Sequence, residues 1–409
     1  MQPEAIFRCI LGEVEALRDP AEPLVVALDD TILLKTGRKI PGAAYRKDPL
    51  GPPFHINLIW AERVVQVAAA VPGPQGQVRM IPIHYKDAST PRKPRKHAPQ
   101  EEWEVYKEVM KQANLNQRAV DSLHALQAAR TRPDQQPRPL HVLVDGSYTN
   151  RKVLKNLPPN TVLIGRIRKD AHLNFLPEKQ PQHGRKRIYG QHAPTPEELR
   201  QDSDVPWQEV TAQAAGRKHT FRVKSLAPLR WRAAGKDQHL RLVVIAPVPY
   251  LKKLGSKTLY RKPAYLICTD PDLPLHTIVQ HYIWRWDIEV NHRDEKTLLG
   301  VGQAQVRNEH SVESVPAAAV AAYAMLQVAA VKAFGWDGQP NTLPPPKWRN
   351  PEKKKRASTL DLINEMRREL WASAIRPAHL HHFVSRPHTH TKSEKCMPSL
   401  CDAVFYSTA

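Results

Sequence analysis

The stretch that says most about this chain is YIWRWDIEVNHRDEK, from Tyr282 to Lys296. We expect it to be helical. At about 100° per residue, four of its side chains fall within an arc of roughly 60° on one helix face: Tyr282, Arg285, Glu289 and Lys296. A carboxylate flanked by such groups suits a site where the acid holds a divalent cation and its neighbours bind phosphodiester oxygens. The same residues could equally form a surface helix with intrahelical ion pairs, such as Arg285 to Glu289, without any function.

Two apolar runs upstream carry acids that would lie within or at the end of a buried strand. The run LVVALDDTILL, from Leu24 to Leu34, is almost wholly apolar, which is typical of a strand covered on both faces. An acid there is costly unless it is paired or binds metal. Asp29 and Asp30 would point to opposite faces. The second run ends at Asp145, which could instead be a turn residue that caps the next helix.

The spacing Y-x2-R-x3-E-x6-K resembles the signature around the third acid of DDE transposases from bacterial insertion sequences. The two upstream acids resemble that family's Asp-x-Thr and Asp-x-x-Tyr motifs. The resemblance implies an α/β fold, an RNase H-like mixed sheet flanked by helices, with a β-rich insertion between the second and third acids. It also implies that Asp29, Asp145 and Glu289 are the catalytic, metal-binding residues. Asp29 is chosen because the ligand comes first in Asp-x-Thr, and Asp30 is the alternative.

The resemblance also implies a chemistry. Three carboxylates are hard oxygen ligands that suit two Mg2+ or Mn2+ ions, which can activate a water or a 3′-hydroxyl and stabilise the leaving oxygen. The expected reactions are cleavage at transposon ends followed by strand transfer into target DNA. Tyr282, Arg285 and Lys296 would position the backbone phosphate, and Arg293, one turn beyond Glu289, would add a contact.

Composition agrees with a polyanionic partner. The formal net charge is +21 and the pI is about 9.9, which favours nucleic acid. The family resemblance specifies this partner as transposon terminal inverted repeats and target DNA, bound by a homodimer in a synaptic complex. The four scattered cysteines, the absence of a signal peptide and the absence of an apolar stretch long enough for a bilayer predict a soluble, cytoplasmic, nucleoid-associated protein without membrane contact.

We expect five segments: 1–23, a short N-terminal segment; 24–168, the first part of the RNase H-like core; 169–262, the insertion; 263–334, the second part with the catalytic helix; and 335–409, a Pro-rich linker, an amphipathic helix and a polar tail. One long helix is expected over 101–130. Trp207 and Trp231 in the insertion are candidates for handling a flipped base, although core packing is the simpler role. The His- and Cys-bearing tail matches no usual zinc spacing.

Two alternative functions stay open. An RNase H-like nuclease without strand transfer would keep the acids but only nick DNA. A truncated, catalytically silent DNA-binding derivative is also consistent, because only 28 residues precede Asp29, whereas this family usually begins with a larger helical domain. The sequence does not specify the terminal repeats, the target preference, or whether excision passes through a hairpin.

Overall fold

The computed structural model describes residues 3–49, 51–52, 54–73, 76–91, 93–131, 138–178, 180, 183–214, 217–253, 255–336 and 356–374. The chain divides into two compact units, residues 1–325 and residues 326–409. Most of the expected Pro-rich linker and the whole His- and Cys-bearing tail lie outside the described residues.

Unit 1 is built around a mixed sheet whose strands match the apolar runs of the sequence. The described strands are β1 (Leu24–Leu34), β2 (Ala44–Lys47), β3 (Leu58–Pro72), β4 (Val78–Asp87), β5 (Leu140–Val144), β6 (Thr161–Arg166), β7 (Asn174–Phe175), β8 (Gln208–Ala214), β9 (Arg217–Arg230), β10 (Leu240–Ile245) and β13 (Ala264–Cys268). They form one 11-stranded sheet in the order β2-β3-β1-β5-β6-β13-β10-β9-β7, with β4 on β3 and β8 on β9. A separate pair joins β11 (Pro249–Tyr250) to β12 (Leu259–Tyr260).

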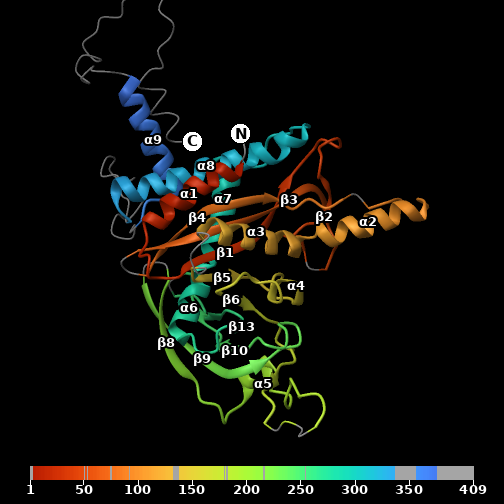
Figure 1. Ribbon diagram of the computed structural model, residues 1–409. Coiled ribbons are helices and arrows are strands. Elements are labelled where there is room, and N and C mark those ends of the chain that lie inside the picture. Colours follow the sequence, from red (N-terminus) through yellow and green to blue (C-terminus); the bar gives the residue numbers. More distant parts are fainter. Residues whose placement is uncertain are drawn as a thin grey trace, which may run out of the picture. The chain divides into compact units, whose positions relative to one another are not determined.

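Helices flank this sheet. They are α1 (Pro3–Ala16), α2 (Gln100–Gln112), α3 (Leu115–Arg130), α4 (Arg151–Leu154), α5 (Pro196–Gln201), α6 (Leu275–Trp284), α7 (Trp286–Leu298) and α8 (Glu309–Phe334), which continues into unit 2. α1 contacts β4, α7 contacts β1 and β4, and α6 contacts β8. Figure 1 shows the red and orange strands of the first part and the green strands of the insertion as two ends of the same sheet.

The centre of the sheet has the strand order expected of an RNase H-like core. Here β4, β3 and β1 are antiparallel neighbours, and β5 and β6 then add in parallel to β1. The region between the second and third acids is β-rich, as expected, and its strands β9 and β10 extend this sheet through β13. The predicted fold class, a mixed α/β sheet flanked by helices, is confirmed.

The single helix expected over 101–130 is wrong, because the structure ends α2 at Gln112 and begins α3 at Leu115. The break has a local cause. Asn114 has extended dihedral angles, and its side chain accepts a hydrogen bond from the Gln117 backbone N–H, so it is the N-cap of a new helix. Asn in this role needs neither Pro nor Gly to interrupt the chain.

The stretch from Tyr282 to Lys296 is also two helices rather than one. α6 ends at Trp284 and α7 begins at Trp286, with Arg285 between them. The Arg285 N–H still bonds the His281 carbonyl four residues back, but the Ile288 N–H bonds the Arg285 carbonyl only three residues back. This tighter turn places Tyr282 on a different helix from Glu289 and Lys296.

α8 contradicts the expectation that no apolar stretch is long enough for a bilayer. It has 26 residues and is long and apolar enough to cross a membrane by length and composition, with 50% of its most apolar window buried. Within unit 1, its Tyr323 hydroxyl donates to Asn291 Oδ1 at 2.9 Å, and Asn291 Nδ2 donates to the Met80 carbonyl at 2.9 Å. This part of α8 therefore packs as a core helix does.

The described residues of unit 2 contain the end of α8 and one further helix, α9 (Thr359–Ala374). Ser358 caps α9: the Ser358 hydroxyl accepts from the Asp361 N–H at 3.3 Å, and the Ser358 N–H donates to Asp361 Oδ2 at 2.7 Å. A small apolar cluster of Ala330, Ala357 and Leu362 holds the two helices together.

Candidate active site

Strand register brings the first two acids level with one another. β1 and β5 are parallel neighbours in which Ala27 is paired with Leu143. Asp29 lies two residues beyond Ala27, and Asp145 lies two residues beyond Leu143, just after β5 ends. Because side chains alternate with a period of two residues, both carboxylates lie on the same face of the sheet.

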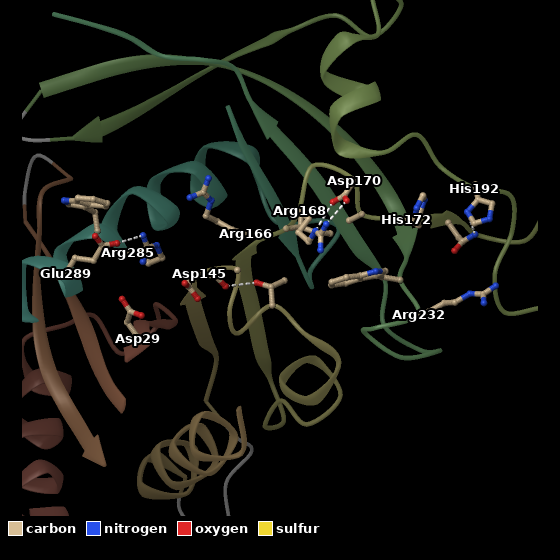
Figure 2. Close-up of a pocket in the computed structure, with 17 residues that line it drawn as sticks. Asp29, Asp145, Arg166, Arg168, Asp170, His172, His192, Arg232, Arg285 and Glu289 are labelled. Carbon is tan, nitrogen blue, oxygen red and sulfur yellow. Dashed lines mark hydrogen bonds and ion pairs between the residues drawn. The ribbon is translucent and has the colours of Figure 1, made fainter. Parts of the chain in front are cut away.

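The third acid reaches this face from a helix. Glu289 lies in the first turn of α7, which contacts β1. Asp29, Asp145 and Glu289 all line one open cavity of about 1100 Å³. Figure 2 shows the three carboxylates at one end of the cavity, one each from β1, the end of β5 and α7. The three acids predicted from the sequence are therefore brought together.

Asp30 lies on the other face of β1 and is occupied with structural contacts. The hydroxyl of the buried Tyr148 donates to Asp30 Oδ1 at 2.7 Å, and Arg63 Nε lies 3.2 Å from Asp30 Oδ2. Tyr148 is the tyrosine of the Asp-x-x-Tyr motif, three residues after Asp145. The motif thus ties the turn that carries Asp145 to the strand that carries Asp29. This geometry favours Asp29 over Asp30 as the acid that faces the cavity.

The acids lie in a field of like charge. Burial raises the pKa of Asp29 to about 6; His292 opposes the shift, and the neighbouring charges of Asp30 and Asp145 add to it. The Asp30 backbone N–H donates to Asp29 Oδ1 at 2.9 Å and so partly stabilises the ionised form. The Asp29 carboxylate would have to be ionised to bind a cation, but its surroundings disfavour the ionised form. Such perturbed pKa values are typical of acids at functional sites.

The four basic and aromatic signature residues lie in different surroundings. Arg285 lines the cavity, and its Nη2 donates to Glu289 Oε1 at 2.8 Å, while its buried Nε has no hydrogen-bond partner. Tyr282 packs against the apolar core, and the Arg285 guanidinium lies 5.9 Å from its ring centroid.

The other two basic signature residues do not line the cavity. Lys296 Nζ donates to Thr31 Oγ1 at 2.6 Å, which connects α7 to β1. Arg293 is exposed and forms an ion pair at 2.8 Å with Asp294. Of the predicted phosphate-binding residues, only Arg285 therefore lies in the cavity with the acids.

Sequence reasoning missed a basic arm of the same cavity. From the acids, the cavity continues along the end of β6, the segment after it and the turn after β9, where it is lined by Arg166, Arg168, Asp170, His172, Trp231 and Arg232. Arg168 Nη2 lies 2.8 Å from Asp170 Oδ2. Figure 2 shows these cationic side chains leading away from the carboxylates. Trp231, one of the two tryptophan candidates, lies here. Trp207 instead packs under Lys224 Nζ, 4.8 Å from its ring centroid. In the sequence, these residues lie far apart and outside any motif.

The three carboxylates are a possible donor set for a divalent cation. Among the described residues, no group of three or more His, Cys, Asp or Glu side chains is close enough to hold a metal ion. The chemistry of the donors nevertheless fits one. The ligands are carboxylate oxygens, which hard cations prefer. Burial, and then the like charges of Asp30 and Asp145, raise the pKa of Asp29, and a bound cation would offset both effects.

The comparison with known families agrees with this fold. A family model described as "DDE superfamily endonuclease" matches residues 2–236, and the chain belongs to this family. The matched residues include Asp29 and Asp145, and Glu289 lies beyond them. Membership implies nuclease activity on DNA, and nucleases of this class generally use divalent metals. A search of curated proteins found no match.

Proposed function

We propose that the protein is a DDE transposase that cleaves DNA at transposon ends and transfers the resulting strand into target DNA. One observation carries the proposal: carboxylates from β1, the end of β5 and α7 share a cavity that is also lined by four arginines, Arg166, Arg168, Arg232 and Arg285. Family membership supports the nuclease step. The signature from Tyr282 to Lys296 and the net charge of +21 support DNA transposition in particular.

In this proposal, Asp29, Asp145 and Glu289 hold two Mg2+ ions. The ions would lower the pKa of the attacking water or 3′-hydroxyl and stabilise the leaving oxygen. The protein orients the acids: β-sheet register fixes the first two, and the Arg285 ion pair fixes the third at 2.8 Å.

Phosphate binding is assigned first to Arg285. Its buried Nε has no partner, and a phosphate oxygen at the cavity could accept this hydrogen bond. The Tyr282 ring lies against the Arg285 guanidinium, and Lys296 connects α7 to β1 through its hydrogen bond to Thr31. Arg293, exposed on α7, would contact the DNA backbone outside the cavity.

The basic arm of the cavity would determine the path of the DNA backbone to the acids. Arg166, Arg168 and Arg232 are exposed cations along the cavity wall, and they would contact successive phosphates that lead to the acids. The proposed substrates are terminal inverted repeats and target DNA. A homodimer is proposed for the synaptic complex, because two ends must be joined to one target.

A nuclease without strand transfer is the second candidate, because the matching family is described as an endonuclease. The two functions differ in their products. We expect pre-cleaved terminal-repeat DNA, incubated with the protein, Mg2+ and a supercoiled plasmid, to become covalently joined to the plasmid. Plasmid that is nicked but never joined to the donor DNA would contradict transposition and favour the nuclease.

A further inference from the structure

α7 presents more than Glu289 to the sheet. His292 follows Glu289 by three residues and Glu295 follows His292 by three, so each lies roughly 60° further round the helix than the one before it. Their relative exposures are only 7% and 2%. Two adjacent ionisable side chains are rarely buried together unless they act on each other or on a third group.

A residue of the sheet binds the Glu295 carboxylate. Gln66 Nε2 donates to Glu295 Oε1 at 2.9 Å. Gln66 on β3 is the register partner of Asp29 on β1, so its side chain and that of Asp29 lie on the same face. The other Glu295 oxygen lies 3.6 Å from His292 Nδ1. A continuous row therefore runs from Gln66 through Glu295 to His292.

His292 lacks a hydrogen-bond partner at the other end of this row. Among the residues that the structure describes, neither of its ring nitrogens has a partner within hydrogen-bond distance, although the side chain is only 9% exposed. Buried polar atoms of this kind are uncommon and call for an explanation. Glu295 is the neighbour of His292 Nδ1, so Nε2 is the nitrogen that can bind a second group.

Contacts on either side of His292 place it beside the part of β1 that carries Asp29. Three residues before it, Glu289 lines the same cavity as Asp29. Four residues after it, Lys296 donates to Thr31 Oγ1 at 2.6 Å, and Thr31 is two residues beyond Asp29 on the same face of β1.

We propose that His292, braced by Glu295 and Gln66, is a positioning residue that fixes the Asp29 carboxylate toward the cavity. This inference deepens the proposed function and rests on it. A carboxylate that binds a cation is usually oriented by an outer hydrogen-bonding partner, and loss of that partner weakens metal binding about 10-fold to 100-fold. His292 reaches Asp29 from the same helix that carries Glu289, so one element sets two of the three acids.

The test measures Mn2+ binding to the full chain without DNA, by the electron paramagnetic resonance signal of free Mn2+. His292→Ala removes the ring. His292→Gln keeps an N–H near the position of Nε2, and Glu295→Gln removes the charge behind the ring. Thr297→Ala, on the exposed side of α7, is the control. Thermal unfolding is followed for each variant, so that loss of fold is separated from loss of Mn2+ binding.

We expect His292→Ala to weaken Mn2+ binding at least about 10-fold, and His292→Gln to restore most of it. Glu295→Gln should weaken binding less, and its effect should not add to that of His292→Ala, because both act through one row. The control should bind as the wild type does.

Folded His292→Ala protein that binds Mn2+ as tightly as the wild type would overturn the positioning role, and so would equal losses for His292→Ala and His292→Gln. Asp29→Asn separates the two levels of the argument. If Asp29→Asn abolishes Mn2+ binding and His292→Ala leaves it unchanged, only this inference fails. If the wild-type protein binds no Mn2+, the proposed function fails with it.

Discussion

Adjacent acids in β1 have opposite tasks. Asp29 faces the cavity with Asp145, whereas Asp30 on the other face accepts a hydrogen bond from Tyr148 and pairs with Arg63. The ionised form of Asp29 is disfavoured by burial and by like charges, and its pKa is raised to about 6. The protein therefore carries an unfavourable charge at the position where a divalent cation would bind.

The raised pKa predicts an unusual stability effect. Above about pH 6 the folded protein must hold Asp29 ionised, whereas the unfolded chain ionises it near the ordinary value of 3.8, so the folded state is penalised at neutral pH and not below pH 4. In EDTA, we expect Asp29→Asn to stabilise the fold at pH 7.5 by up to roughly 3 kcal/mol and to give no gain at pH 4. Urea unfolding at the two pH values measures this.

Asp30→Asn is the matched control. It weakens the hydrogen bond from Tyr148 and the ion pair with Arg63, so it should destabilise the protein at pH 7.5. Destabilisation by both variants at pH 7.5 would contradict the different tasks assigned to the two acids.

A substitution at Glu289 separates DNA cleavage from DNA binding. Glu289→Gln keeps the size of the side chain and a hydrogen-bond acceptor for Arg285, but removes the charge that would hold a cation. We expect strand cleavage to be abolished while DNA affinity changes by less than about threefold, because phosphate contacts dominate affinity. Equal loss of cleavage and of binding in a gel-shift assay would count against its assigned role.

At the scale of single residues, part of the site could be predicted from the sequence and part could not. Asp29, Asp145 and Glu289 stood out because an acid within or at the end of an apolar run, or at a fixed motif spacing, is visible in one dimension. Arg168 and Arg232 are exposed residues on separate loops, and nothing in the sequence pattern distinguishes them from other surface cations. Their shared cavity depends on how the insertion strands join the sheet.

At the scale of elements, the site depends on where each element ends. β5 ends one residue before Asp145, and α7 begins three residues before Glu289. The apolar runs predicted β1 and β5 well, because burial on both faces gives a continuous pattern. The break at Arg285 was missed, since its dihedral angles remain helical and no Pro or Gly marks it.

The turn after β9 gives a prediction at this scale. Arg232 lines the basic arm, and Lys236 in the same turn is exposed but does not line it. We expect Arg232→Gln to weaken DNA binding equally for all sequences and to reduce the slope of log affinity against log salt by about one. Lys236→Gln should change neither quantity. Fluorescence anisotropy across a salt series measures both, and equal effects of the two variants would remove the basic arm from the DNA path.

At the scale of the whole molecule, fold and charge agree on one class of partner. An RNase H-like sheet, membership in the DDE superfamily of endonucleases and a net charge of +21 all indicate DNA. The class of fold was predictable because strands such as β1 and β5 and the acids they carry follow one pattern. The joining of β9 and β10 to the same sheet was not, because strand pairing between distant segments leaves no local signal.

The measurement that tests the central claim most directly is cleavage of a labelled duplex that carries terminal inverted repeats, taken from the DNA flanking the gene. Mg2+ and Mn2+ are compared with Ca2+, and the wild type is compared with Asp145→Asn. The account predicts cuts at the repeat boundary with Mg2+ or Mn2+ that disappear with Asp145→Asn, while DNA binding persists. DNA binding without metal-dependent cleavage by the wild type, or cleavage that survives Asp145→Asn, would contradict it.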